Sequence, residues 1–105
     1  MTRRMVHYKV HPEQAESNEQ LIRAVFEELR ELDPPGVRYE AFVLADGVSF
    51  VHLVEHEDGP NPIPELASFK RYTAQVRERC AEPPVVTDAR LIGSTGLASP
   101  ATSDN

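Results

Sequence analysis

Hydrophobic and polar residues alternate over positions 5–10, which is the pattern of a β-strand with one buried face. Over positions 21–32 apolar residues recur every three or four positions instead, and this spacing predicts an amphipathic helix. Ser17 and Gln20 have the spacing of a capping box and are predicted to begin this helix. The Asp-Pro-Pro-Gly run at positions 33–36 is predicted to end it. The chain is therefore expected to start with a strand followed by a helix.

The middle of the chain has the pattern of a hairpin. Two strand-like runs, residues 37–44 and 48–55, flank a segment with Asp46 and Gly47, and an Asp-Gly pair supplies the positive φ angles of a tight turn.

A second helix is predicted from an apolar stripe at helical spacing, ended by the prolines that follow Glu82. This stripe consists of Leu66, Phe69, Thr73, Val76 and Cys80. Residues 85–92 are predicted to form the last strand.

The predicted order of elements, β-α-β-β-α-β, is that of the ferredoxin-like α+β sandwich, a four-stranded antiparallel sheet with two helices on one face. The chain has 105 residues, which is enough for one compact domain and hardly for two. We assign residues 1–93 to this domain. Residues 94–105 contain one large apolar residue, Leu97, and are predicted to be a flexible tail.

Apolar residues occupy both faces of the two middle strands, since Tyr39 and Phe42 in one, and Phe50 and Val51 in the other, point to opposite sides. The helices can cover only one face. We therefore expect the other face to be buried against a second copy, in a homodimer formed through the sheet faces. The alternatives are a dimer formed through strand edges only, or an apolar face left open, because much of any protein surface is apolar.

Charge and composition narrow the classes of partner. The chain carries 11 Lys+Arg against 17 Asp+Glu, and a formal net charge of −6 argues against nucleic-acid binding. No run approaches the roughly 20 apolar residues of a membrane span, so no membrane association is expected. The first ten residues lack the apolar region of a secretory signal, and the single cysteine, Cys80, cannot form an internal disulfide. These features predict a soluble, cytoplasmic protein.

Three stretches carry a resemblance to a known family: Val-x-Tyr-x-Val at 6–10, Gly-Val-Arg-Tyr-Glu at 36–40, and Ser-Phe-Val-His-Leu-Val-Glu-His-Glu-Asp at 49–58. Over about residues 5–93 the chain resembles the antibiotic biosynthesis monooxygenase (ABM) type of dimeric α/β barrel. The resemblance implies two four-stranded sheets facing each other in a dimer, with a pocket between sheet and helices in each subunit. Some members of this family oxidise polycyclic phenols or quinols with O₂ and no cofactor, others degrade haem, and many have no assigned activity.

The chain departs from the family pattern where the chemistry is expected. It contains no Trp, and residues 55–58 are Glu-His-Glu-Asp where the family often has an Arg-Trp-Glu-Asp-like stretch. Residues 65–72, at the start of the second predicted helix, lack the His-Phe pair common there. The Asn, Trp and ligating His of the haem-degrading relatives cannot be placed. We therefore expect no haem and no other cofactor.

His52 and Tyr72 are the candidate catalytic residues. His52 lies mid-strand among apolar residues, with His7 or Tyr8 expected across from it if the first and third strands pair. A base of near-neutral pKa could take a proton from a phenol and leave an electron-rich anion able to react with O₂. The alternative is a hydrogen-bonded structural histidine. Tyr72, on the sheet-facing edge of its helix, could orient a phenolic or quinone oxygen, or its ring could simply fill the core.

Five further residues are assigned to substrate binding: Tyr8, Tyr39, Phe69, Arg71 and His56. For Tyr8 and Tyr39 the alternative is packing, and for Arg71 it is a surface ion pair. His7 and His11, like His52 and His56, are four residues apart, which on a strand separates them by about 13 Å, too far to share a metal. No metal site is predicted.

Two functions stay open at this point. One is a cofactor-independent monooxygenase acting on a small aromatic phenol or quinol in a pocket between sheet and helices. The other is a non-catalytic ABM-like dimer that serves small-ligand binding or subunit association. No phosphate-binding loop, Ser-His-Asp order or paired carboxylates suggest a hydrolase, a kinase or a nucleotide-dependent enzyme.

Overall fold

A computed structural model describes residues 1–96, so residues 97–105 of the predicted tail lie outside the described part of the chain. The strands are β1 (Thr2–Val10), β2 (Val37–Val43), β3 (Ser49–His56) and β4 (Cys80–Asp88). The helices are α1 (Ala15–Leu32), α2 (Ala67–Thr73) and α3 (Val76–Arg79), with two 3₁₀ turns, η1 (Pro12–Gln14) and η2 (Ile63–Glu65). The order of the main elements confirms the predicted ferredoxin-like α+β fold.

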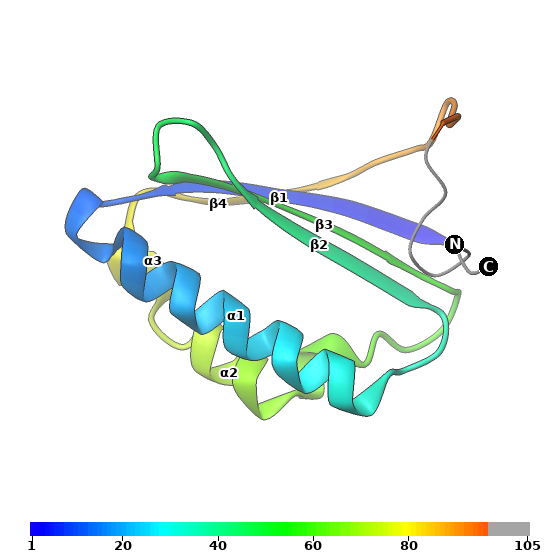
Figure 1. The fold of residues 1–105 in the computed structure, drawn as a ribbon. Helices are drawn as coiled ribbons and strands as arrows, with labels where there is room; N and C mark the ends of the chain where they lie inside the picture. Colours follow the sequence, from blue (N-terminus) through cyan, green and yellow to red (C-terminus); the bar gives the residue numbers. More distant parts are fainter. Residues whose placement is uncertain (97–105) are drawn as a thin grey trace.

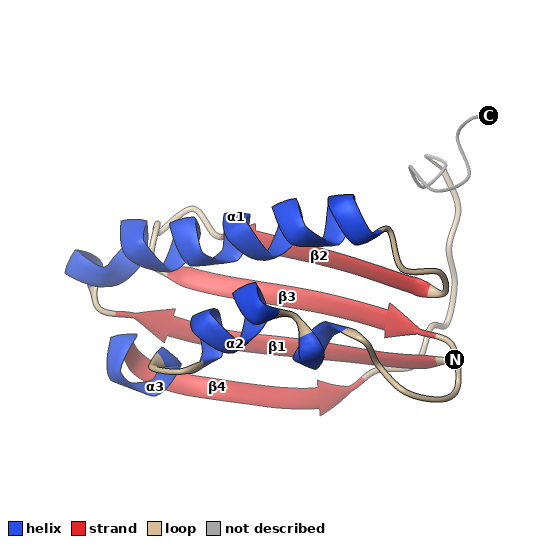
Figure 2. Ribbon diagram, turned by 90° about the horizontal axis from the view of Figure 1, so that it is seen from below, coloured by secondary structure: helices blue, strands red, loops and turns tan. Residues whose placement is uncertain are grey.

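The four strands form one antiparallel sheet in the order β2-β3-β1-β4. Helices α1 and α2 pack against the same face of this sheet, as Figures 1 and 2 show from two directions. Among the described residues, no helix covers the other face (Figure 1). The sheet of the single chain is open, so a closed α/β barrel requires a second copy. No helix in residues 1–96 is long and apolar enough to cross a bilayer.

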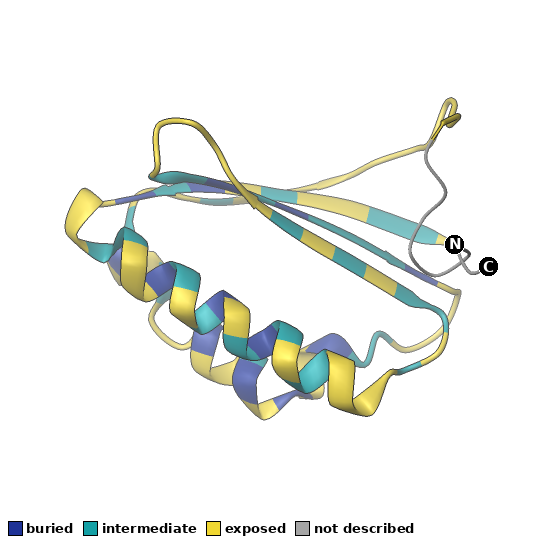
Figure 3. Cartoon of the chain, in the orientation of Figure 1, coloured by how far each residue is buried: buried dark blue, intermediate teal, exposed yellow. Residues whose placement is uncertain are grey.

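The hydrophobic core lies between the sheet and the helices (Figure 3). Val10 of β1 and Val25 of α1 are each 1 % exposed, and Tyr8 stacks on Phe50 with ring centroids 5.5 Å apart. The pairing of β1 with β3 places Tyr8 opposite Phe50 and Val6 opposite His52. Because side chains alternate along a strand, Tyr8, Val6 and His52 all project to the helix-covered face.

The start of the first helix differs from the prediction. Ser17 and Gln20 lie inside α1, which begins at Ala15 directly after η1, and no side chain caps its first turn. Pro12 explains the early start, because its fixed φ angle and missing N–H suit the first position of a helical turn. The end agrees with the prediction: Asp33 takes a left-handed conformation (φ 44°), and its N–H donates to the Leu29 carbonyl.

The hairpin between β2 and β3 pairs as predicted, but its turn is looser. Of the turn residues only Gly47 has a positive φ angle, 76°, and the strands close through the Leu44 N–H donating to the Ser49 carbonyl. The Asp46 carboxylate accepts hydrogen bonds from the N–H groups of Val48 and Ser49. Asp46 therefore stabilises the turn through its side chain rather than through its backbone conformation.

The second predicted helix is broken, and the last strand begins earlier than predicted. Gln75 has a non-helical conformation between α2 and α3, and Cys80, assigned to the helical stripe, is the first residue of β4. Pro83 and Pro84 lie within β4 rather than ending a helix. They are tolerated because β4 is an edge strand, and its pairing with β1 changes register next to them. The strand thus spans residues 80–88 instead of 85–92.

Candidate functional site

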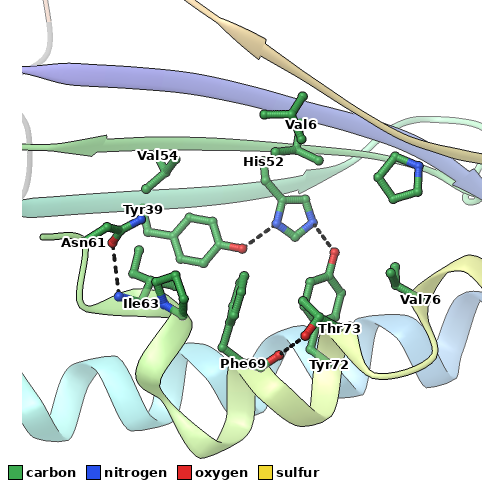
Figure 4. Close-up of a pocket in the computed structure, with 13 residues that line it drawn as sticks. Val6, Tyr39, His52, Val54, Asn61, Ile63, Phe69, Tyr72, Thr73 and Val76 are labelled. Atoms are coloured by element: carbon green, nitrogen blue, oxygen red, sulfur yellow. Dashed lines mark hydrogen bonds between the residues drawn. The ribbon is translucent and has the colours of Figure 1, made fainter.

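A cavity of about 240 Å³ lies between the sheet and helix α2 (Figure 4). Its walls are largely apolar, which suits an aromatic ligand with few polar groups. The strands contribute Val6, Tyr39, His52, Val54, Pro84 and Val86, and the helical side contributes Asn61, Ile63, Pro64, Phe69, Tyr72, Thr73 and Val76.

His52 is 3 % exposed, and tyrosine hydroxyls occupy both nitrogens of its ring. Nδ1 lies 2.6 Å from the Tyr39 hydroxyl, and Nε2 lies 3.0 Å from the Tyr8 hydroxyl. The Tyr72 hydroxyl is 3.4 Å from the same Nε2, and Figure 4 shows Tyr39 and Tyr72 on opposite sides of the imidazole. Residues from β1, β2, β3 and α2 therefore meet at one ring.

A second layer of hydrogen bonds lies behind this ring. The Tyr8 hydroxyl accepts hydrogen bonds from the Tyr72 hydroxyl at 2.6 Å and from the Asn18 Nδ2 at 2.9 Å. Asn18, on α1, has no exposed surface, and its Oδ1 accepts a 3.0 Å hydrogen bond from Arg79 Nε. Arg79 Nη2 also donates to the main-chain carbonyl of Tyr72, at 2.6 Å. The chain of contacts thus runs from Arg79 through Asn18 and Tyr8 to His52.

Arg79 is a buried cation, 7 % exposed, whose hydrogen-bond partners are neutral. Within residues 1–96, no carboxylate forms an ion pair with it. Its guanidinium carbon lies 5.6 Å from the centre of the Tyr72 ring, which is within the range of a cation–π contact. A positive charge is therefore held directly behind Tyr72, one of the tyrosines that line the cavity.

Burial keeps the groups around the cavity neutral. It lowers the pKa of His52 to about 4, so the imidazole is uncharged at pH 7. Burial also raises the pKa values of Tyr39 and Tyr72 far above their ordinary value, and it raises the pKa of Tyr8. The cavity therefore presents hydroxyl groups and a neutral imidazole, rather than a charged acid or base.

The predicted site residues fall into two groups. His52, Tyr72, Tyr39 and Phe69 all line the cavity, and Tyr8 lies behind His52, in hydrogen-bond contact with it. His7, the other residue expected near His52, is exposed and pairs with Val51, so its side chain projects to the uncovered face.

Two of the predicted substrate-binding residues lie away from the cavity lining. His56 is 7 % exposed, and its Nδ1 is 2.9 Å from the carbonyl oxygen of Glu57. Arg71 is exposed and lies near Glu28, on the outer side of α2. Among residues 1–96, no three His, Cys, Asp or Glu side chains gather as metal ligands would.

Asn18 and Arg79 belong to the site but were not predicted from the sequence. Asn18 precedes Ile22 by four residues and Val25 by seven, so it lies on the buried stripe of α1. A polar residue on the apolar stripe of a helix is expected to be buried and hydrogen-bonded, and this pattern could have identified Asn18. Arg79 had a weaker signal, because the break at Gln75 interrupts the helical spacing that would relate it to Tyr72.

Comparisons with known proteins place the fold. No family model matches the sequence, and no curated protein matches it. The structure of Rv0793 from Mycobacterium tuberculosis is 20% identical, with 90% of this chain and 98% of that chain aligned at a TM-score of 0.70. A structure named as an antibiotic biosynthesis monooxygenase is 17% identical, with 89% and 100% of the two chains aligned at 0.67.

A third solved structure, provisionally named an antibiotic biosynthesis monooxygenase from Nitrosomonas europaea, is 21% identical, with 89% and 100% of the two chains aligned and a TM-score of 0.70. At identities this low the likeness shows a shared fold, and function has to be argued from the site. The ferredoxin-like fold expected from the order of elements, which is also the fold of these ABM-named structures, is confirmed.

Proposed function

We propose that this protein is a cofactor-independent monooxygenase that binds a small phenol or quinol in the cavity between sheet and helices. The observation that carries the proposal is the hydrogen-bonded group of Tyr39, His52 and Tyr72 in the lining of a largely apolar cavity. An apolar cavity selects an aromatic ring, and a few converging polar groups orient its hydroxyl. The names of the solved structures with this fold support the reaction class.

The proposed reaction converts a phenol with a free para position and O₂ into a quinone and water. The ring gains one oxygen atom, its O–H and para C–H hydrogens leave in the water molecule, and four electrons pass from ligand to O₂. Removal of the phenolic proton is the step that a protein base assists, because it leaves a more electron-rich ring. We assign this role to His52, acting through the Tyr39 hydroxyl that occupies its Nδ1.

Tyr72 and Phe69 then position the ligand. The Tyr72 hydroxyl orients a ligand oxygen, and the Phe69 ring, 5.8 Å from the Tyr72 ring, offers an aromatic surface for stacking. Val6 and Val54 form the sheet side of the cavity. A monocyclic or bicyclic aromatic suits a cavity of this size better than a long flexible ligand.

Two observations favour the non-catalytic alternative, a dimer that binds the same kind of ligand without oxidising it. Burial lowers the pKa of His52 to about 4, which makes the imidazole a weaker base than a free histidine. Both of its nitrogens are also engaged by tyrosines. Ligand binding is therefore common to both functions, and oxygen consumption separates them.

We also propose that the protein is a homodimer formed through the uncovered sheet face. Met5, Phe42 and Val85, on three different strands, are 38 %, 47 % and 48 % exposed. The strand pairing places Leu53 next to Met5, and Val51 next to Phe42, on this same face. Apolar residues that continue across neighbouring strands form a patch that a second sheet of the same kind can bury.

A single free cysteine, Cys80, is usual for a reducing compartment, and we propose the cytoplasm as the location.

The test is oxygen uptake by purified protein with a metal chelator, using 1-naphthol and 1,5-dihydroxynaphthalene, which both have a free para position, as probes. Uptake by the wild-type protein well above the spontaneous rate would support the oxygenase, provided that it falls by about 100-fold in His52→Gln. The control His11→Gln changes an exposed histidine and should leave the uptake rate unchanged. Binding of both probes without uptake would establish the non-catalytic alternative. Absence of binding would overturn the ligand class.

A further inference from the structure

Tyr39, His52, Tyr8 and Tyr72 form a hydrogen-bonded cluster, which we call the relay, and the number of hydrogens it can donate exceeds the number of links in its series by one. In its neutral form each of these four groups carries one hydrogen that it can donate, three as hydroxyls and one on the imidazole. Three hydrogen bonds of 2.6–3.0 Å join them in series, from Tyr39 to His52, from His52 to Tyr8, and from Tyr8 to Tyr72, and a longer one of 3.4 Å also joins Tyr72 to His52. Each link in the series uses one hydrogen, so one of the four hydrogens is not used within the relay. This hydrogen belongs to the residue at one end of the series.

Both ends of the relay line the cavity. Tyr39 reaches it from β2 and Tyr72 from α2, whereas Tyr8 lies behind them and is absent from the lining. The hydrogen left over is therefore offered to a ligand by one end, while the hydroxyl oxygen of the other end is free to accept. The chain contains three tyrosines, and all three belong to the relay.

Asn18 and Arg79 restrict the direction in which Tyr8, in the middle of the relay, can donate its hydrogen bond. Arg79 can only donate hydrogen bonds, so the Asn18 Oδ1 faces it and the Asn18 Nδ2 faces Tyr8. The Tyr8 oxygen thus always accepts from Asn18, and its own proton is directed to His52 or to Tyr72. When the three shorter hydrogen bonds are all made, this constraint leaves the relay two ordered arrangements.

In the first arrangement Tyr72 donates to Tyr8, Tyr8 donates to His52 Nε2, and the Nδ1–H of His52 donates to Tyr39, whose own proton faces the cavity. In the second, every hydrogen bond is reversed, His52 carries its hydrogen on Nε2, and the free proton belongs to Tyr72. To pass from the first arrangement to the second, one hydrogen moves along each of the three links, while the Tyr72 oxygen takes up a proton from the cavity and Tyr39 releases its own proton into it. No group becomes charged in either.

We propose that the protein uses this relay to interconvert the keto and phenol tautomers of its aromatic ligand, an isomerase activity that needs no oxygen. The keto tautomer loses a proton from its ring carbon to the Tyr72 oxygen, each relay hydrogen moves one link onward, and Tyr39 delivers its proton to the carbonyl oxygen of the ligand. One C–H bond breaks and one O–H bond forms, the ring double bonds shift, and no electrons are gained or lost overall. His52 changes from its Nδ1–H to its Nε2–H form.

The burial of His52 agrees with this role. A buried imidazole is costly to charge, which weakens it as a simple base. The relay uses the two nitrogens together, one giving and one receiving a proton, so an imidazolium never forms.

The inference rests on the ligand class of the proposed function but not on the reaction with O₂, so it is tested without oxygen. We expect 1-naphthol in D₂O, under anaerobic conditions, to exchange its ring hydrogen at position 4 for deuterium at least about tenfold faster with the protein than in buffer, as followed by NMR. Tyr39→Phe and Tyr72→Phe each remove one end of the relay, and each should abolish the acceleration while 1-naphthol still binds. His11→Gln is the control expected to leave exchange unchanged, because His11 is exposed and outside the cavity.

The tautomer of His52 gives a second readout that a purely structural histidine would not move. In ¹⁵N-labelled protein at pH 7 we expect a neutral imidazole whose Nδ1–H and Nε2–H populations change when 1-naphthol is added. An imidazolium signal at pH 7, or tautomer populations that do not change when 1-naphthol binds, would overturn the relay. Oxygen uptake without anaerobic exchange would overturn the relay and leave the oxygenase standing, whereas failure of 1-naphthol to bind would overturn both.

Discussion

Arg79 donates a 2.6 Å hydrogen bond to the main-chain carbonyl of Tyr72, the residue whose side chain forms one end of the relay. In an uninterrupted helix this carbonyl would accept from the N–H of Val76, four residues on. The break at Gln75 frees it, and Arg79 replaces the missing donor. The interruption of the second helix and the position of the site are therefore linked.

The first prediction concerns this buried cation. Arg79→Met removes the donor to Asn18 Oδ1 and to the Tyr72 carbonyl, and each unpaired buried acceptor should cost about 1–3 kcal/mol of unfolding free energy. Asn18→Leu in the same chain should restore part of the loss, because it removes one of the unpaired acceptors. Urea denaturation of both single variants and the double variant measures this coupling. Arg77→Met, at an exposed position nearby, is the control, and strictly additive effects would contradict the network.

The second prediction concerns pH. The pKa of His52 is about 4 in the folded chain and 6.5 when free, so below pH 6.5 the unfolded state takes up a proton that the folded state does not. Stability from this group is fully present above about pH 6.5 and is lost as the pH falls toward 4, by at most about 3 kcal/mol.

Urea denaturation between pH 7 and 5 measures this effect. Asp46 stays charged throughout this window, because hydrogen bonds from Ser49 and Val48 lower its pKa to about 2. His52→Gln should make the profile flatter, and His11→Gln should not. A wild-type profile as flat as that of His52→Gln would show that burial does not control the protonation of this imidazole.

The third prediction concerns assembly. Leu53→Arg places a charge in the middle of the uncovered sheet face and should convert the proposed dimer into a monomer, because an unpaired charge is costly to bury. Sedimentation velocity of both proteins at several concentrations measures the mass. Leu32→Arg is the matched control, since Leu32 is 59 % exposed at the far end of α1. A wild-type protein that sediments as a monomer throughout would refute the dimer.

The fourth prediction concerns the end of α1. Asp33 has a φ angle of 44°, in the left-handed region where a glycine meets no steric cost from a side chain. Asp33→Gly should therefore raise the unfolding free energy by up to about 1 kcal/mol, and Asp33→Val should lower it by a similar amount or more. Thermal and urea denaturation of both variants give the sign. Loss of stability in the glycine variant would mean that the Asp33 side chain, and not its backbone, holds this turn.

Much of the fold could be predicted because it depends on local patterns. The alternation over residues 5–10 and the apolar spacing over 21–32 each fall within an element that forms, and the 33–36 run ends α1 where expected. The errors lie where neighbours override the pattern. Cys80 has helical spacing, yet it pairs with Val10 as the first residue of β4. Pairing with β1 gives the backbone of this segment its hydrogen bonds, and the spacing of apolar residues along the chain does not reveal such pairing.

The site was predicted only in part for the same reason. His52 stood out as a histidine among apolar residues, and Tyr72 and Tyr39 lay on the faces expected to be buried. Their hydrogen bonds were not predictable, because the Tyr8 hydroxyl reaches His52 across 44 residues of chain and Arg79 reaches Asn18 across 61. These contacts depend on strand register and on the break in the second helix.

The sequence by itself determined the order of elements, the hairpin, the two apolar faces of the sheet and the residues able to move a proton. These follow from the spacing of side chains along a helix or strand, which is a local property. Only the tertiary structure decided which of those residues meet, since the meeting point lies between elements distant in the chain. It also decided that His52 is neutral, because the state of a titratable group is set by its burial and by the neighbours that folding brings to it.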